Sequence, residues 1–366
     1  MYPQIIIIPA YEPDQRLIRY VDQLLHAGFE KLIIIDDGSS TECQEIFRQI
    51  QVKNMEGGKV TLLHHPKNRG KGAALKTGIL HGQRIYGKGN TYITVDSDGQ
   101  HLVKDVIAVA KEMQAAPDAL VLGCRDFSGR DVPWRSRFGN RITSKFFYLM
   151  NGKKVPDTQT GLRGIPENLV DLALSEEGTR YEYEMDFLSD AVDQARLVFV
   201  PIQTVYEDGN QCSHFHPIRD SIRIYGRFLR FLVASLSGSA TDLLLFALIL
   251  ASIGSGNAEI IEATVLARIC SGIVNFEMNR HISFRSRGEA KSEMLRYGVL
   301  FVTQMAASAA AVTLLSQAIP SIVAKILIDV TLFFLSYLIQ KKWVFGKQSK
   351  EKPYIFHKSL HREEFI

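Results

Sequence analysis

The sequence predicts an α/β domain with a mostly parallel sheet, followed by an all-α domain of four transmembrane helices. Up to about residue 228, short apolar runs alternate with charged segments of helical length. From there to about residue 345, four long apolar stretches follow one another, a composition typical of membrane proteins. The mean hydropathy of -0.01 averages over these unlike halves. The net charge of +4 is modest and no arginine-rich arm is present, so a nucleic-acid partner is not expected.

Short apolar runs in the first half predict the strands of the sheet. They lie at residues 5–8, 31–35, 60–64 and 119–123, with one more beginning at Tyr92. Helical segments are expected at 14–27 and 103–115. Continuous apolar runs are typical of strands covered on both faces, and alternating strands and helices give a parallel sheet. Loops rich in Asp, Gly and Lys fall at the carboxyl ends of these strands, the edge where such sheets bind ligands.

The strand that begins at Tyr92 ends in two carboxylates, Asp96 and Asp98, one residue apart. Side chains alternate along a strand, so both would share one face if the extended geometry persists, and both could reach one Mg²⁺ or Mn²⁺. Gln100 could add a third oxygen. A cation held this loosely keeps positions open for substrate phosphates. The spacing alone is a weak signal, because surface turns are rich in Asp and Gly.

Two other polar loops follow predicted strands. The Asp-Asp-Gly-Ser segment at 36–39 fits a nucleoside pocket, and a strand-to-helix turn capped by a serine is an equally good interpretation. The loop at 68–72 could bring Arg69 or Lys71 to a phosphate, although a flexible turn is favoured for either residue alone. The loop lacks the P-loop spacing, and no G-x-G-x-x-G motif follows the first strand, which excludes these two common nucleotide sites.

Five motifs, in this order, resemble family 2 glycosyltransferases of the GT-A fold. They are P-A-Y-E from Pro9, D-D-G-S from Asp36, G-K-G from Gly70, D-S-D-G-Q from Asp96 and D-T-Q-T-G from Asp157. The resemblance covers roughly residues 3–216 and is strongest to the polyprenyl-phosphate branch, which includes dolichyl-phosphate mannose synthase and bactoprenol glucosyltransferases. It implies a Rossmann-like GT-A domain that binds a nucleotide sugar.

The same resemblance implies roles for individual residues. The nucleoside of the donor would be held by Pro9, Tyr11, Glu12 and Asp37. The metal and the diphosphate would be held by Asp96, Asp98 and Gln100, and Lys71 of the G-K-G motif remains a candidate for the phosphates. The lipid phosphate would meet Arg125 and either Arg135 or Arg137. Many relatives carry a lysine for the diphosphate near Ser213, where this chain has His214.

Asp157 could orient the donor sugar. Glu182 or Glu184 could act as a base for a hydroxyl acceptor, although a polar helix face is the favoured interpretation of these two glutamates. A phosphate monoester is largely dianionic at neutral pH, since its second pKa is about 6, and it needs arginines more than a base.

Four apolar stretches predict the membrane spans, each near the ~20 residues that cross a bilayer. They lie at 231–253, 260–284, 297–319 and 322–339. Lys and Arg cluster between the second and third spans and after the fourth, so the positive-inside rule places both termini and the catalytic domain in the cytosol. Asp242, Arg268 and Asp329 lie inside spans and are expected to face one another, as a polar pathway or as a static ion cluster.

The spans form two hairpins whose closing segments, 275–284 and 336–345, are alike, and this half resembles the GtrA-like membrane domain. The predicted organisation is a GT-A domain at 1–216, an interfacial amphipathic helix at 217–230, the GtrA-like domain at 231–345 and a cytosolic tail at 346–366.

The predicted function is that of a plasma-membrane, inverting, metal-dependent hexosyltransferase. It would move a sugar from a nucleotide sugar, with UDP-glucose favoured, to a polyprenyl phosphate of the undecaprenyl type, for decoration of cell-envelope polysaccharide. Direct glycosylation of a glycolipid or polysaccharide is the first alternative. A transporter of lipid-linked sugar whose soluble half only binds nucleotide sugar is the second. The sequence leaves the sugar and a homo-oligomeric state open.

Overall fold

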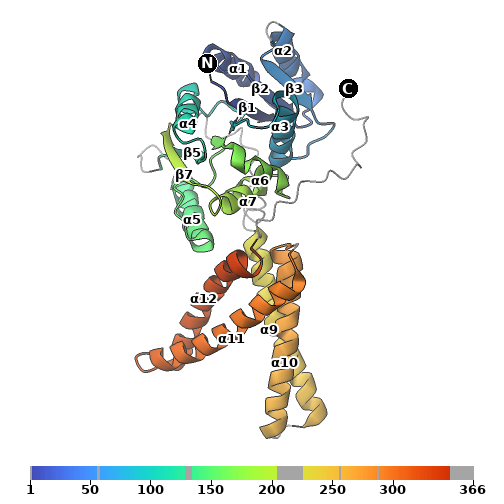
Figure 1. Ribbon diagram of the computed structural model, residues 1–366, viewed down its shortest axis with the longest axis vertical. Coiled ribbons are helices and arrows are strands. Elements are labelled where there is room, and N and C mark those ends of the chain that lie inside the picture. The colour runs from blue at the N-terminus through green and yellow to red at the C-terminus, as the bar shows by residue number, and fades with distance from the viewer. Residues whose placement is uncertain are drawn as a thin grey trace. The chain divides into compact units, whose positions relative to one another are not determined.

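The chain divides into two units, Met1–Gly226 and Arg227–Ile366 (Figure 1). The computed structural model describes residues 2–55, 58–127, 134–203, 226–254, 257–286 and 288–346. Most of the expected interfacial helix at 217–230, nearly all of the expected tail, and the candidate residues Ser213 and His214 lie outside these ranges.

The first unit is built on a seven-stranded sheet with the order β3-β2-β1-β4-β6-β5-β7. The strands are β1 (Ile5–Ala10), β2 (Leu32–Asp36), β3 (Val60–His64), β4 (Tyr92–Thr94), β5 (Leu120–Arg125), β6 (Arg163–Ile165) and β7 (Leu197–Ile202). All neighbours pair in parallel except β6, which is antiparallel to β4 and β5. The mostly parallel sheet is therefore confirmed.

Helices cover both faces of this sheet. They are α1 (Gln15–His26), α2 (Gln44–Met55), α3 (Lys71–Tyr86), α4 (Val103–Ala115), α5 (Trp134–Asn151), α6 (Val170–Ser175) and α7 (Glu182–Ala191). Ile6 and Ile8 of β1 belong to a buried cluster with residues of α1, α2 and α4, whereas Ile5 and Ile7 belong to one with residues of α3, α6 and α7. Both faces of β1 are buried, which explains its continuous apolar run.

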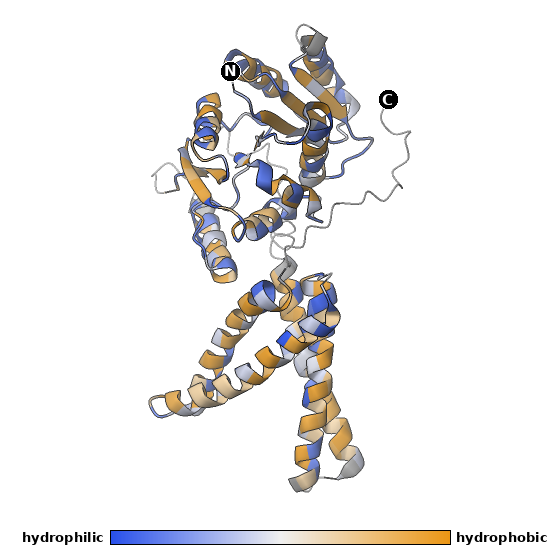
Figure 2. Cartoon of the chain, in the orientation of Figure 1, coloured by the Kyte–Doolittle hydropathy of each residue, from blue (hydrophilic) through white to orange (hydrophobic). Residues whose placement is uncertain are grey.

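The second unit consists of long helices, α9 (Gly226–Ile253), α10 (Asn257–Met278), α11 (Ala290–Leu315) and α12 (Ser321–Ile339). Among the described residues, three segments are long and apolar enough to cross a membrane: Phe228–Ser252, Ala290–Leu315 and Ser321–Val344 (Figure 2). The second expected span corresponds to α10, which has 22 residues and carries four charged side chains, Glu259, Glu262, Arg268 and Glu277. That α10 crosses the bilayer stays a prediction.

The two hairpins of the second unit end alike. A π-helical turn, η4 (Asn279–Ser283), follows α10, and a second, η5 (Gln340–Val344), follows α12. The first residue of each turn is buried. The phenylalanines that follow the turns, Phe284 and Phe345, stack with their ring centroids 5.1 Å apart. This likeness agrees with the internal repeat in the closing segments.

Charged side chains inside the hairpins form two separate ion pairs. Arg268 Nη2 lies 3.2 Å from Asp242 Oδ2, while Lys325 Nζ lies 2.8 Å from Asp329 Oδ1. Asp242 and Arg268 therefore face each other as expected, whereas the ion-pair partner of Asp329 is Lys325. Lys325 is one helical turn from Asp329 on α12, so the local partner satisfies that carboxylate first.

Candidate active site

Asp96 and Asp98 lie in the turn that follows β4, at the carboxyl edge of the sheet. The strand ends at Thr94, so the extended geometry on which their predicted common face depended does not persist. The backbone N–H of Gln100 donates to Asp98 Oδ1 at 3.0 Å, and Gly99 has a φ of 74°. This local side-chain-to-backbone bond and the left-handed glycine turn the chain away from the strand.

Lys71, the first residue of α3, sits between two carboxylates from distant parts of the chain. Its Nζ lies 2.7 Å from Asp96 Oδ1 and 3.0 Å from Glu184 Oε2, which is on α7. The other oxygen of Asp96, Oδ2, lies 3.2 Å from Nε2 of the buried His101. We call Lys71, Asp96 and Glu184 the lysine triad. It joins three elements at the centre of the candidate site.

The two carboxylates after β4 have opposite electrostatic surroundings. Burial would raise the pKa of Asp96, but the Lys71 ammonium and the His101 ring lower it well below its usual range. Burial raises the pKa of Asp98, and the neighbouring Asp96 carboxylate raises it further. The anionic form of Asp98 is therefore disfavoured in these surroundings.

The residues present fit a divalent cation. Within the described ranges, no group of three or more His, Cys, Asp and Glu side chains is placed to hold a metal ion. Two carboxylates, Asp96 and Asp98, and the Gln100 amide oxygen nevertheless form a hard-oxygen donor set of the kind that Mg²⁺ and Mn²⁺ accept beside phosphates. A bound cation would favour the anionic form of Asp98, which burial and the Asp96 carboxylate disfavour.

A cavity of about 370 Å³ opens beside this turn. It is bordered by α1 and the turn after β4, and its lining residues are Arg16, Arg19, Tyr20, Gln23, Asp98, Gly99 and Gln100. Two of the three predicted metal-binding residues thus face a space large enough for part of a ligand.

Gly161 lies directly against Asp96. A Cβ at this position would stand 2.3 Å from Asp96 Oδ2, and the Gly161 carbonyl accepts a hydrogen bond from Thr94 Oγ1 at 2.8 Å. A side chain at this position would have to displace the Asp96 carboxylate, which Lys71 and His101 hold. This close approach accounts for the glycine of the D-T-Q-T-G motif.

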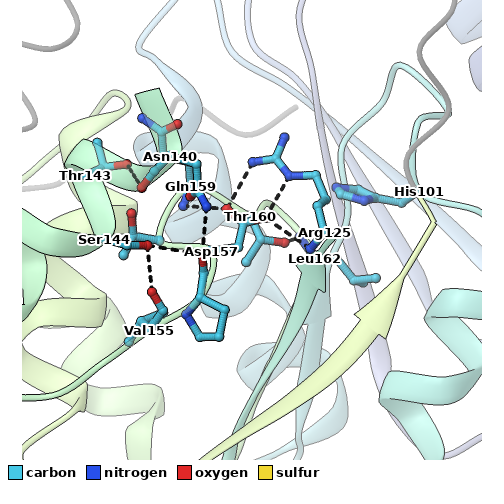
Figure 3. A network of polar contacts seen from close by, with 12 residues as sticks. His101, Arg125, Asn140, Thr143, Ser144, Val155, Asp157, Gln159, Thr160 and Leu162 are labelled. Carbon is cyan, nitrogen blue, oxygen red and sulfur yellow. Dashed lines mark hydrogen bonds and ion pairs between the residues drawn. The ribbon is translucent and has the colours of Figure 1, made fainter. Parts of the chain in front are cut away.

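Asp157 is fully buried and holds Arg125 (Figure 3). Arg125 donates through Nε to Asp157 Oδ2 at 2.7 Å and through Nη2 to Oδ1 at 3.0 Å, a bidentate pair. The neighbouring loop is tied to α5, because Asn140 Nδ2 donates to the Pro156 carbonyl at 2.8 Å and Ser144 Oγ to that of Val155 at 2.7 Å. Asp157 therefore fixes the guanidinium of Arg125, which is 24% exposed.

Arg163 holds the same loop from the other side, and the sequence reasoning missed it. It is 2% exposed and donates to three backbone carbonyls, those of Thr158, Thr160 and Glu184. These bonds link the loop that carries Asp157 to the helix that carries Glu184. The available signal was an arginine next to the D-T-Q-T-G motif at the start of the apolar Gly-Ile segment of β6.

Asp37, predicted to meet the nucleoside, is buried and already makes several hydrogen bonds. Its carboxylate accepts from the backbone N–H groups of Arg69 at 2.9 Å and Gly70 at 2.7 Å, and lies 2.7 Å from His65 Nδ1. His65 in turn contacts Thr77 Oγ1 at 3.0 Å. The sequence reasoning missed His65. Asp37 thus joins the loop after β2 to the loop that leads into Lys71.

Glu12 makes a similar bridge at the end of β1. Its carboxylate accepts from the backbone N–H of Ser40 at 2.7 Å and from the hydroxyl of Ser40 at 2.8 Å, and its φ is 48°. Pro9 lies within β1, and Tyr11 is 38% exposed beside this bridge. Pro9, Tyr11, Glu12 and Asp37 therefore lie on neighbouring strand ends, as the motif order predicts.

The predicted acceptor arginines are placed only in part. Arg137 lies in the first turn of α5, which also carries Asn140 and Ser144. The side chain of Arg135 lies outside the described part of the chain. The structure brings Lys71 to Asp96, and Arg125 to Asp157, at the same edge of the sheet.

Comparisons with known proteins agree with this geometry. Residues 5–171 match the family model Glycosyl transferase family 2, and residues 230–345 match the model GtrA/DPMS, transmembrane domain. An uncharacterized protein of Methanocaldococcus jannaschii is 30% identical over 208 residues, which are 56% of this chain and 82% of that protein.

Two further relatives are named for their activities. The UDP-N-acetylglucosamine–dolichyl-phosphate N-acetylglucosaminyltransferase of Methanococcus voltae is 28% identical over 56% of this chain and 86% of its own length. The dolichyl-phosphate beta-glucosyltransferase of Homo sapiens is 25% identical over 43% of this chain and 53% of its own length. These matches confirm the resemblance seen in the motifs. The chain belongs to glycosyl transferase family 2 and carries a GtrA/DPMS transmembrane domain in its second half.

Proposed function

We propose that this glycosyltransferase moves a hexose from a nucleotide sugar, with UDP-glucose as the favoured donor, to polyprenyl phosphate in the membrane. The observation that carries the proposal is the pairing of Asp157 with Arg125 at the sheet edge that also holds Asp96 and Asp98. The part with Asp96 and Asp98 suits a metal-bound donor diphosphate, and the part with Arg125 suits an anionic acceptor. The relatives that act on dolichyl phosphate support the same class of acceptor.

Asp96, Asp98 and Gln100 would hold a Mg²⁺ or Mn²⁺ ion, which would neutralise the charge that grows on the departing nucleoside diphosphate. The chain's own residues do the rest. Arg125, fixed by Asp157, offers a guanidinium to the acceptor phosphate. Because the buried carboxylate sets its orientation, the guanidinium reaches the phosphate with little loss of side-chain entropy.

The acceptor phosphate needs no base from the protein. A phosphate monoester has a second pKa of about 6 and is mostly dianionic at neutral pH, so it can attack the anomeric carbon directly, with inversion. The two glutamates considered as bases are engaged with other partners. Glu184 pairs with Lys71 at 3.0 Å, and Glu182 Oε1 accepts from the backbone N–H of Thr179 at 3.1 Å. This supports a phosphate over a sugar hydroxyl as acceptor.

The membrane half supports a lipid acceptor. Three apolar helices anchor the chain, and the proposed orientation puts the GT-A domain on the cytosolic side, where nucleotide sugars are made. We propose domain limits of 1–216 and 231–345, with 217–230 as an interfacial helix and 346–366 as a tail. The lipid-linked product would supply cell-envelope glycan decoration.

A transfer assay tests the proposal. Purified full-length protein is incubated with Mn²⁺, undecaprenyl phosphate and a panel of labelled UDP-glucose, UDP-galactose, UDP-N-acetylglucosamine and GDP-mannose. We expect label in a lipid monophosphate sugar, formed best from one UDP-sugar and lost in Asp98→Asn. The matched control is Asp118→Asn, which changes an exposed carboxylate in the turn before β5 and leaves the rate unchanged.

Two outcomes would point elsewhere. Label in a polysaccharide or glycolipid, without the lipid monophosphate sugar, would favour direct glycosylation. Binding of the nucleotide sugar without transfer to any acceptor would favour a transporter with a sensing domain.

A further inference from the structure

Within the lysine triad, the Lys71 ammonium occupies a carboxylate oxygen of Asp96 that a cation would need. Asp96 offers two oxygens: Oδ2 lies against the buried His101 ring, and Oδ1 receives the Lys71 ammonium at 2.7 Å. His101 is 6% exposed and its ring is short, so it has little room to move, whereas Lys71 has a flexible four-carbon stem. A metal ion that binds Asp96 would therefore displace Lys71 rather than His101.

Glu184 gives Lys71 a second anchor that does not depend on Asp96. Its Oε2 lies 3.0 Å from Lys71 Nζ, and its side chain is 11% exposed. Within the described ranges its other oxygen, Oε1, is buried and has no hydrogen-bond partner. The backbone of Glu184 is held by Arg163, which donates to its carbonyl at 2.6 Å. Glu184 is thus fixed in place and has a spare acceptor for an ammonium that changes position.

We propose that Lys71 is an exchangeable counter-ion of the cleft. Without donor and metal, it neutralises Asp96. When a metal-bound diphosphate enters, Asp96 would release Lys71 to hold the cation, and Lys71, still held by Glu184, would turn its ammonium to the diphosphate. Glu184 is a positioning residue that keeps Lys71 within reach in both states. This inference rests on the proposed function, because it assumes a metal-bound diphosphate donor.

The charges explain why the exchange is favourable only when both partners arrive. A cation alone must compete with an ammonium that is already well paired, and separation of that pair leaves one positive charge near another. A diphosphate brings negative charge that attracts both the cation and Lys71. Donor and metal should therefore bind cooperatively, and Lys71 should be the source of that cooperativity.

Mn²⁺ binding tests the inference without reference to turnover. Free Mn²⁺ is measured by its EPR signal during titration of purified full-length protein, with and without saturating UDP, and with GDP in parallel. The variants are Lys71→Met and Glu184→Gln. The charge-matched control is Lys59→Met, because Lys59 lies next to β3 and pairs with Glu30 away from the cleft.

The expected results have opposite signs in the two conditions. Without nucleotide, Lys71→Met should bind Mn²⁺ about tenfold more tightly than the wild type, because the competing ammonium is gone. With nucleotide, Lys71→Met should bind Mn²⁺ more weakly than the wild type, because it lacks the ammonium that helps to hold the diphosphate. Glu184→Gln should bind Mn²⁺ several-fold more weakly without nucleotide, since Lys71 then pairs with Asp96 alone. Lys59→Met should match the wild type in both conditions.

A merely structural lysine would behave differently. Its loss would weaken Mn²⁺ binding in both conditions, and that result would overturn the inference, as would identical curves for Lys71→Met and the wild type. If Lys71→Met fails to fold, as judged by circular dichroism, Glu184→Gln still tests the inference. Weaker Mn²⁺ binding by Glu184→Gln without nucleotide would support it, and unchanged or tighter binding would overturn it. If the wild type binds neither Mn²⁺ nor either nucleotide, the proposed function itself fails.

Discussion

Gly161 and Asp96 show how closely two motifs that are far apart in the sequence approach each other. The position that a Cβ would take at Gly161 lies 2.3 Å from one carboxylate oxygen of Asp96 and 2.6 Å from the other. Asp157, four residues earlier, is completely buried against Arg125. At the scale of single residues, the candidate site therefore depends on a missing side chain and on a buried charge pair.

Replacing Gly161 by alanine should disable the cleft while leaving the fold largely intact. The added methyl group would push Asp96 away from its place, and such overpacking costs about 1–3 kcal/mol. We expect glycosyl transfer to fall at least about tenfold. Gly298→Ala is the control, since an added Cβ there meets no atom within 4 Å. Equal rates of glycosyl transfer for Gly161→Ala and Gly298→Ala would contradict this view of the cleft.

Removing the charge of Asp157 should destabilise the first unit. Asp157→Asn leaves the Arg125 guanidinium, whose side chain is 24% exposed, without its carboxylate, and breaking a largely buried pair in this way costs at most about 3–5 kcal/mol. Thermal unfolding followed by circular dichroism measures the loss. Glu45→Gln breaks the Arg48–Glu45 pair, whose side chains are 75% and 53% exposed, and it should leave the midpoint unchanged. Equal midpoints for the two variants would show that the buried pair is not structural.

At the scale of elements, the second unit is organised by the ends of its hairpins. Asn275, just before the first π-helical turn, donates to the Ala234 carbonyl at 3.3 Å and accepts from Tyr297 Oη at 2.9 Å and from Asn279 Nδ2 at 2.7 Å. These bonds join α9, α10 and α11. The corresponding Ser336 of α12 bonds to Gln304 of α11 at 3.2 Å.

Asn275→Ala should loosen this three-helix contact. The variant removes hydrogen bonds that are worth about 1–2 kcal/mol in a membrane environment. We expect a lower midpoint for unfolding in detergent. Thr303→Val is the comparison, because Thr303 bonds only to the Val299 carbonyl of its own helix, among the contacts of the described residues. If both changes have the same effect, Asn275 does not organise the hairpins.

Elements that depend on local pattern were predictable from the sequence, and those that depend on distant partners were not. The strand at 60–64 and the helix at 103–115 appear with the expected limits, since their periodicity is set by burial. The short antiparallel β6 and the end of β4 before Asp96 could not be predicted, because pairing across the sheet and a local turn decide them. The lysine triad could not be predicted either, because no spacing in the sequence connects Lys71 to Glu184 of α7.

At the scale of the whole molecule, we propose that the sugar-transfer domain lies on the cytosolic side of the bilayer that the second unit spans. The positive charges that set the proposed orientation lie between α10 and α11, at Arg280 and Arg285, in the second turn of α11, at Arg296, and after α12, at Lys341 and Lys342. By the positive-inside rule these segments would face the cytosol. The segment between α9 and α10 would then lie outside.

Cysteine labelling in intact cells checks this orientation. Ser255→Cys should react with a membrane-impermeant maleimide added to intact cells, whereas Ser349→Cys should react only after the membrane is permeabilised. The unchanged chain gives the background from its four native cysteines. Labelling of Ser349→Cys in intact cells would place the C-terminus outside and contradict the proposed orientation.

The central claim is that the cleft at Asp96 and Asp98 transfers a sugar, without its phosphate, to a lipid phosphate. The mass of the lipid product formed by purified protein from a nucleotide sugar and undecaprenyl phosphate tests this most directly. We predict a product with a single phosphate between lipid and sugar, which disappears in Asp98→Asn and when the divalent cation is removed by a chelator. A diphosphate-linked product, or an undiminished yield from Asp98→Asn, would contradict the account.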